Sequence, residues 1–407
     1  MMEDCLLWAV FFCGKKGFPD YAICTEKNAD CVESYNSNYF FAIMSAKSTR
    51  YKRGAKNMGK TEEILAHAAW AGASDVHITA GIPPKMRQNG RLTALPFQTM
   101  TATDTLDIAR GIMNEEQMRC FEEKGEYDLS FAVAGQGRYR VNVFRQQGNV
   151  AMAFRLVPEK IPSAKDLGVP DSVIGLYQRK RGLVLVTGPT GSGKSTTLAA
   201  IIDKVNIFRD AHVVTLEDPI EYIHQHKKSM VHQREIGRDT LSYANALRAA
   251  LREDPDVILV GEMRDYETIG VAVTAAETGH LVLSTLHTIG AASTIDRIID
   301  VFPTHQQQQI RIQLADVLEA VISQQLIPRS DDMGRVAAFE VLHASLAVRN
   351  LIREGKTHQI PSMMQTSRRL GMIAMDDAIV QLYREGKITR EMAAAFAQEP
   401  DTIENRL

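Results

Sequence analysis

The sequence predicts an α/β fold built around a parallel sheet, and two observations carry that prediction. Apolar stretches at residues 183–186, 213–216, 257–260 and 281–283 alternate with stretches of helical period, which is typical of parallel strands covered by crossover helices. A glycine-rich loop follows the first of these stretches and opens a helix. With 407 residues, 45% of them hydrophobic, the chain is long enough for two or three compact domains.

Composition argues against several classes of protein. Charged residues make up 24% of the chain and the formal net charge is −2, so we expect no nucleic-acid partner and no global attraction to acidic lipid. The apolar stretch at residues 5–13 is too short to cross a bilayer and lacks the flanks of a signal peptide, so we expect a cytosolic protein without a transmembrane segment. The cysteines lack C-x-x-C spacing, which argues against a disulfide framework or zinc site: Cys5, Cys13, Cys24, Cys31 and Cys120.

Residues 1–57 differ from the rest of the chain. They mix aromatic, cysteine and polar residues before a basic run at residues 50–53, and they show no sustained period. We predict an atypical extension that is either disordered or not translated, with translation beginning at Met58. Recovery of peptides from residues 1–57 by mass spectrometry of the native protein would contradict the later start.

Residues 58–157 predict a small α+β domain. The apolar stripe of Ile64, Leu65, Ala68 and Ala69 indicates a helix that ends near Gly72. The other expected elements are strands at residues 76–79, 127–133 and 138–145, a hairpin turn at Asn89-Gly90, and one helix over residues 102–121. In the strand at 138–145, alternation places Tyr139, Val141 and Val143 on one face and Arg138, Arg140 and Asn142 on the other. One face of this domain is therefore predicted to be basic.

Three prolines and a glycine mark residues 158–170 as an interdomain linker, where we expect a hinge. The α/β core is predicted to follow over residues 171–302. From about Phe302 the pattern becomes almost wholly helical, so residues 303–407 are predicted to form a C-terminal helical region.

The strongest functional motif lies between the strand at 183–186 and the helix after it. It matches G-x-x-x-x-G-K-[ST] and comprises Gly188, Pro189, Thr190, Gly191, Ser192, Gly193, Lys194 and Ser195, followed by Thr196. Glycines let the backbone curl so that its N–H groups surround phosphate oxygens, Lys194 reaches the terminal phosphates, and the Ser195 hydroxyl ligates Mg²⁺. These nine residues are the predicted ATP site; the alternative is a chance glycine-rich turn.

Carboxylates follow two further strands. Glu262 comes directly after the strand at 257–260, at the sheet edge where nucleotides bind in such folds, and we predict that it is the general base that primes water. The segment 217–221 adds more carboxylates, and Glu221 is predicted to support magnesium or water. The alternatives are a surface glutamate for Glu262 and a simple turn former for Glu221.

Two histidines flank the strand at 281–285, one at each end, which makes a shared metal site improbable. His287 would lie at the carboxyl edge and contact the γ-phosphate, whereas His280 has the weaker functional claim; a structural role is the alternative for both. Hydrolysis also needs positive charge from a neighbouring subunit, for which the candidates are Arg138, Arg140 and Arg155. Those arginines are alternatively a solvated strand face.

Four ordered blocks, at residues 188–196, 215–224, 254–265 and 278–288, resemble the secretion and pilus ATPases from Met58 onward. The resemblance implies a PAS-like N-terminal domain, a RecA-like P-loop ATPase domain, and a homo-hexamer with ATP and Mg²⁺ at its interfaces. It further implies that Lys194 and Ser195 bind phosphate and magnesium, that Glu262 is the catalytic base, that Glu221 and His287 tune the site, and that Arg138, Arg140 and Arg155 act across the interface.

Two features favour the retraction motors of type IV pili within that family. Extension and secretion relatives carry a four-cysteine zinc module after the histidine block, yet no cysteine follows Cys120 here. Residues 347–352 read AVRNLI, which resembles the AIRNLI segment of retraction motors. The expected role is twitching motility through pilus disassembly, at the cytoplasmic face of the inner membrane with a platform protein as partner. Open alternatives are an assembly or type II secretion ATPase, and a nucleotide-bound regulator without turnover.

Overall fold

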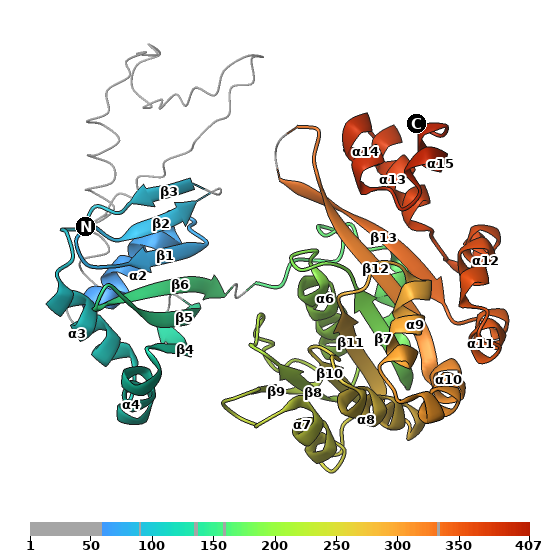
Figure 1. The fold of residues 1–407 in the computed structure, drawn as a ribbon, viewed down its shortest axis with the longest axis horizontal. Helices are drawn as coiled ribbons and strands as arrows, with labels where there is room; N and C mark the ends of the chain where they lie inside the picture. The colour runs from blue at the N-terminus through green and yellow to red at the C-terminus, as the bar shows by residue number, and fades with distance from the viewer. Residues whose placement is uncertain (1–58, 89–90, 134–136, 158–159, 332–333) are drawn as a thin grey trace, which may run out of the picture.

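The computed structural model describes residues 59–88, 91–133, 137–157, 160–331 and 334–407. Figure 1 shows these residues as two lobes. The first lobe ends with strand β6 (Asn149–Val157), and the second contains the helices and strands that follow β6 in the chain. The predicted extension over residues 1–57, the proposed start at Met58 and the Asn89-Gly90 turn lie outside the described residues.

The first lobe is a six-stranded antiparallel sheet with helices packed against it. The strand order is β3-β2-β1-β6-β5-β4. The strands are β1 (Asp75–Ile78), β2 (Lys85–Gln88), β3 (Arg91–Ala94), β4 (Glu126–Val133), β5 (Gly137–Gln146) and β6, and the helices are α2 (Lys60–Trp70), α3 (Ala102–Ile112) and α4 (Glu115–Lys124). Tyr139, Val141 and Val143 of β5 are buried and Arg140 is exposed, as the alternation predicted.

The single helix predicted over residues 102–121 was wrong, because the chain breaks it into α3 and α4. Asn114 interrupts the helix and caps α4: its side chain accepts from Gln117 N, and the Gln117 side chain accepts from Asn114 N. This reciprocal capping satisfies backbone donors that a continuous helix would have used internally.

The second lobe contains a seven-stranded sheet in the order β13-β12-β7-β11-β10-β8-β9. Its strands are β7 (Gly182–Thr187), β8 (His212–Glu217), β9 (Met230–Glu235), β10 (Val257–Val260), β11 (Leu281–Leu286), β12 (Leu318–Pro328) and β13 (Arg335–His343). All neighbours pair in parallel except β12 and β13. The four predicted strands are therefore confirmed as the parallel centre of the sheet.

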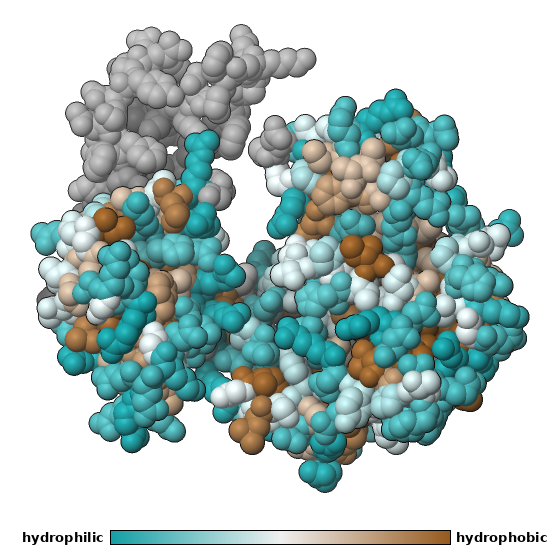
Figure 2. Space-filling view, in the orientation of Figure 1, coloured by the Kyte–Doolittle hydropathy of each residue, from teal (hydrophilic) through white to brown (hydrophobic). Residues whose placement is uncertain are grey.

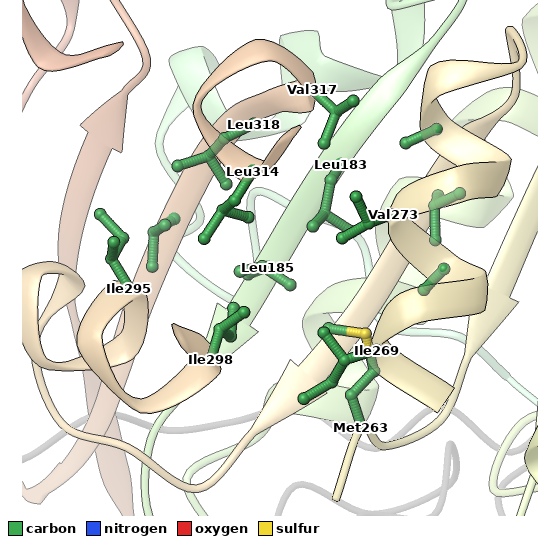
Figure 3. Packing of buried hydrophobic residues seen from close by; sticks show 14 of the residues in the cluster. Leu183, Leu185, Met263, Ile269, Val273, Ile295, Ile298, Leu314, Val317 and Leu318 are labelled. Carbon is green, nitrogen blue, oxygen red and sulfur yellow. The ribbon is translucent and has the colours of Figure 1, made fainter. Parts of the chain in front are cut away.

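Helices cover both faces of this sheet. They are α5 (Asp171–Ile174), α6 (Lys194–Phe208), α7 (Tyr243–Ala250), α8 (Tyr266–Glu277), α9 (Ala291–Asp300) and α10 (Thr304–Val317), with a 3-10 turn η1 (Gly175–Gln178). Figure 3 shows one side of the core, where Leu183 and Leu185 of β7 meet Ile269 and Val273 of α8 and Leu314 of α10. Burial on both faces explains why these strands are continuously apolar.

The prediction of an almost wholly helical segment after Phe302 was wrong for residues 318–343. Strand β12 pairs in parallel with β7 and antiparallel with β13, so this hairpin extends the same sheet. Most of β12 is buried on both faces, which removes the alternation that would have marked it as a strand. Helices resume only after β13: α11 (Leu346–Arg353), α12 (Ile360–Thr366), α13 (Met375–Arg384), α14 (Arg390–Phe396) and α15 (Pro400–Glu404), with the 3-10 turns η2 (Thr357–Gln359) and η3 (Arg368–Leu370).

Hydrophilic side chains dominate the face of the molecule in Figure 2, and hydrophobic residues appear there in scattered patches. No helix in the part of the chain that the structure describes is long and apolar enough to cross a membrane.

Candidate nucleotide site

The glycine-rich loop joins the end of β7 to the start of α6, as predicted. Gly188, Gly191 and Gly193 all have φ between +78° and +140°, a region that side chains disfavour. A Cβ on Gly188 would also collide with the backbone carbonyl of Gln324 on β12. The loop therefore needs glycine for its curl and for its close approach to the neighbouring strand, and its shape leaves backbone N–H groups at the N-terminus of α6 free to bind an anion.

Lys194 lies inside this loop, buried at the first position of α6. Its Nζ donates to the carbonyl oxygens of Gly188 at 2.9 Å and Pro189 at 3.0 Å. Burial lowers the pKa of Lys194, and the charges of Glu262 and Glu221 oppose that shift. Among the described residues, the hydroxyl of Ser192 is buried without a hydrogen-bond partner. A desolvated ammonium and an unsatisfied hydroxyl in one loop fit a phosphate ligand.

Glu262 follows β10 at the carboxyl edge of the sheet, and the residues on either side of it in the chain are hydrogen-bonded to β11. The Thr285 hydroxyl donates to Gly261 O at 2.6 Å, and Met263 N donates to Thr285 O at 3.2 Å, so β11 clamps the chain on both sides of Glu262. Its carboxylate lies 2.7 Å from Arg264 Nη2 and 3.2 Å from His287 Nε2. Burial raises the pKa of Glu262, but Arg264 and His287 outweigh burial and hold it below its usual value.

The two histidines lie at opposite ends of β11, as predicted. His287 follows the carboxyl end of the strand, where its Nε2 faces Glu262 and its Nδ1 lies 3.5 Å from the Thr190 hydroxyl of the glycine-rich loop. His287 therefore bridges the loop and the carboxylate. His280 lies at the other end, where its Nδ1 is 2.9 Å from Ala275 O and 3.2 Å from the Thr278 hydroxyl. Those contacts tie His280 to the end of α8, away from the loop.

The acidic segment after β8 also reaches this edge. Burial raises the pKa of Glu217, although hydrogen bonds from Thr215 and Gln233 oppose the shift. Glu221 is exposed and close enough to Lys194 to act on its pKa. Next to it, the Tyr222 hydroxyl lies 3.0 Å from the Thr196 hydroxyl, which joins the acidic segment to the start of α6. The structure thus gathers Glu221, Glu262 and His287 around the loop.

The three candidate arginines lie in the first lobe, away from this cluster. Arg140 and Arg155 are exposed cross-strand neighbours on β5 and β6, and Arg155 Nε donates to Asp75 at 2.8 Å. Arg138 is half-buried; it donates to the Ser130 hydroxyl and lies 4.0 Å from Glu235 at the end of β9. Among the described residues, no hydrogen bond or ion pair joins these arginines to the glycine-rich loop.

Two polar residues of the β12–β13 hairpin contact the loop, and sequence reasoning missed both. Gln324 is buried, its Oε1 accepts from the Thr197 hydroxyl at 2.7 Å, and its Nε2 lies beneath Gly193. Arg335 donates to Gly191 O at 3.4 Å. A polar pair, Gln324-Gln325, within an apolar stretch was the available signal, but it was hidden by the assumption of a helix.

Gln324→Ala is expected to weaken nucleotide binding roughly ten-fold, because it removes a buried hydrogen bond worth about 1–2 kcal/mol and the support beneath Gly193. The affinity for ADP with magnesium, measured by calorimetry, checks this. Gln309→Ala, an exposed position on α10, is the matched control and is expected to leave the affinity unchanged. Equal affinities for both variants would contradict a role for Gln324 in shaping the loop.

The imidazole of His224, three residues after Glu221, is buried. Burial lowers its pKa from 6.5 to about 4, with Asp203 opposing and Lys227 assisting the shift. The folded state therefore binds fewer protons than the unfolded state between these pH values, so the free energy of unfolding is expected to fall by about 3 kcal/mol as pH drops from 6.5 to about 4.

Urea denaturation across that pH range checks this expectation. His224→Gln is expected to flatten the profile, whereas His305→Gln, an exposed position on α10, is expected to keep it. An unchanged pH slope in His224→Gln would show that other groups cause the acid sensitivity.

Known proteins are similar to this chain in sequence. The family model described as "Type II/IV secretion system protein" matches residues 60–405. The chain is 48% identical over 341 residues to "Type IV pilus retractation ATPase PilT" of Pseudomonas aeruginosa, covering 84% of this chain and 99% of that protein. It is 49% identical over 320 residues to "Twitching motility protein" of Neisseria gonorrhoeae, covering 79% of this chain and 86% of that protein.

A solved structure agrees with these relatives. "Crystal Structure of the Pilus Retraction Motor PilT and Bound ADP" matches with a TM-score of 0.81 at 51% identity, covering 86% of this chain and 100% of that chain. The expected α/β class and the expected resemblance to pilus retraction ATPases are confirmed. Because the family model spans most of its length, the chain belongs to the Type II/IV secretion system protein family.

Proposed function

We propose that this chain is an ATP-hydrolysing motor that drives type IV pilus retraction. One observation carries the proposal: the loop after β7, Glu221 after β8, Glu262 after β10 and His287 after β11 all lie at the carboxyl ends of adjacent parallel strands. Ligands of open α/β sheets bind at that edge. The relatives named above as a pilus retraction ATPase and a twitching motility protein support retraction of the pilus as the task of this motor.

The loop also fits a magnesium-bound triphosphate. Ser195 is only partly buried at the second position of α6, where its hydroxyl would hold Mg²⁺, with Glu221 as the nearby carboxylate. When bound, the ion neutralises charge on the phosphates during transfer to water. Lys194 would exchange its bonds to Gly188 O and Pro189 O for phosphate oxygens, since a charged partner offers a stronger hydrogen bond than a neutral carbonyl.

Glu262 is suited to orient the attacking water. Its lowered pKa keeps the carboxylate ionised near neutral pH, so it can accept a hydrogen bond from water without first losing a proton. The same lowered pKa makes it a weaker base. Arg264 and His287 hold both carboxylate oxygens in place. Because Thr190 links His287 to the glycine-rich loop, a change at the γ-phosphate position would shift His287 and Glu262 together.

The complete site needs a second copy of the chain. Arg138, Arg140 and Arg155 supply positive charge from a neighbouring subunit in a homo-hexamer, where they stabilise the transition state on closure. The ring works at the cytoplasmic face of the inner membrane against a platform protein. Movement of the two lobes relative to each other converts hydrolysis into mechanical work.

ATPase turnover measured together with native mass tests the motor. A ring with turnover supports it, whereas nucleotide binding without turnover favours a regulator. In cells, deletion is expected to leave excess pili that do not retract, and loss of pili would instead indicate an assembly motor.

A further inference from the structure

Glu340 on β13 is a buried carboxylate that the proposed hydrolysis does not use. Only 5% of the residue is exposed. Its Oε1 accepts from Ala291 N at 2.6 Å, its Oε2 accepts from Gln398 Nε2 at 3.1 Å, and the carboxylate also accepts from Met375 N. Burial raises the pKa of Glu340, and these three donors oppose that shift.

Two of these donors begin helices that lack a cap of their own. Ala291 is the first residue of α9 and Met375 is the first residue of α13. The N-cap positions before them, Gly290 and Ala374, make no side-chain capping bond. Helix N-termini carry unpaired N–H groups and a partial positive charge, so one carboxylate from β13 caps both helices.

The first of these helices starts beside the nucleotide site. His287 precedes Gly290 by three residues, and β12 secures the same turn because Gly290 N donates to the Ser323 hydroxyl at 3.0 Å. Ser323 and Glu340 are cross-strand partners in the β12–β13 hairpin. The β12–β13 hairpin therefore accepts hydrogen bonds from two consecutive backbone N–H groups, those of Gly290 and Ala291. They lie where the histidine loop, residues 287–290, meets the start of α9.

The second helix starts the C-terminal helices, α13–α15. Their apolar side chains form a separate cluster, which includes Ile379, Ala393 and Ile403 and reaches the hairpin through Ile327 and Ala338. Gln398 N and Glu399 N donate to the Asp376 carboxylate at 2.8 and 3.1 Å, so the segment that carries Gln398 is joined to the first turn of α13. Met375 and Gln398 thus present one connected unit to Glu340.

We propose that Glu340 is a positioning residue that couples the histidine loop of the nucleotide site to the C-terminal helices, so that nucleotide binding stabilises α13–α15. The inference rests on nucleotide binding at the proposed site. A buried carboxylate that loses a donor is costly, so its bonds to α9 and α13 support one another. Phosphates bound in the glycine-rich loop, including those of ADP, hold Thr190, whose hydroxyl lies 3.5 Å from His287 Nδ1, and so fix the histidine loop and Ala291 N. Ala291 N in turn holds Glu340 in the position that caps α13.

Hydrogen exchange of residues 375–404 tests the coupling, with and without ADP and magnesium. In the natural protein, ADP is expected to slow exchange there on the order of five-fold. In Gln398→Ala the slowing is expected to fall below about two-fold. Because coupling is reciprocal, the affinity for ADP is expected to weaken by the same factor as the slowing decreases. A merely structural role would speed exchange equally with and without ADP and leave the slowing intact.

Gln381→Ala is the matched control, since Gln381 is exposed on α13 and its side-chain amide donates to the exposed Glu385, the residue after the helix ends, at 2.9 Å. It is expected to keep the full slowing. Glu340→Gln keeps the size of the side chain and an acceptor for one helix but places an NH₂ group against another donor, so it is expected to lose the slowing as Gln398→Ala does.

An ADP-dependent slowing that survives in both Gln398→Ala and Glu340→Gln overturns the coupling. So does natural protein that binds and hydrolyses ATP without any slowing over residues 375–404, and in that case the proposed motor function still stands. Natural protein that does not bind ADP overturns the coupling and the proposed function together.

Discussion

Glu262→Gln is expected to lower the rate of ATP hydrolysis by about 10²–10⁴-fold while ADP affinity changes less than about three-fold. The amide keeps the shape of the side chain, but it accepts no proton and replaces the negative charge that faces Arg264 and His287. Loss of kcat without loss of affinity is the pattern of a group that acts in the transition state. Steady-state turnover and calorimetry on the same preparation measure the two quantities.

Glu277→Gln is the matched control for that experiment. Glu277 ends α8, is exposed, and accepts from Gln313 at 3.1 Å, away from the glycine-rich loop. The variant is expected to turn over ATP at the natural rate. Turnover of Glu262→Gln equal to that of the control would remove Glu262 from the role of base and would favour another carboxylate, with Glu221 the first to examine.

Lys194→Ala is expected to weaken ADP binding by roughly 10–100-fold and to abolish measurable hydrolysis, because it removes charge-assisted hydrogen bonds to phosphate worth about 1.5–3 kcal/mol. The loop also loses the two hydrogen bonds that Lys194 Nζ donates to Gly188 O and Pro189 O, so its shape is expected to become less well held. Calorimetry gives the affinity, and the rise in Tm on adding ADP with magnesium gives an independent reading.

Lys180→Ala separates this effect from a general loss of positive charge. Lys180 is exposed just before β7, at the opposite edge of the sheet from the loop. Its variant is expected to retain the natural affinity and the natural rise in Tm. Undiminished ADP binding by folded Lys194→Ala would contradict the assignment of the loop as the phosphate site.

Predictions from sequence succeeded where a local pattern determines local structure. Strands at residues 183–186, 213–216, 257–260 and 281–283 were predicted from apolar runs, because strands buried on both faces need them. The same reasoning failed at β12, where a run also buried on both faces followed a helix directly and contained Gln324 and Gln325. Periodicity cannot distinguish such a run from a buried helix.

The candidate site was partly predictable for a related reason. The carboxyl ends of parallel strands meet at one edge, so the sequence alone predicted that Glu262, Glu221 and His287 lie near the loop. It did not reveal Arg264 as the partner of Glu262 at 2.7 Å, Thr285 as its clamp, or Gln324 beneath the loop. Those contacts depend on strand order and register. The catalytic roles given to these residues stay predictions until the variants are measured.

The sequence by itself determined the α/β class, the glycine-rich loop and the edge of the sheet at which chemistry is expected, because each depends on residues close together in the chain. Only the tertiary structure decided that a hairpin more than 120 residues beyond Gly188 supports the loop, and that Glu340 of the same hairpin caps both α9 and α13. Such contacts join segments far apart in sequence, and only packing of the whole sheet brings their atoms within hydrogen-bonding distance.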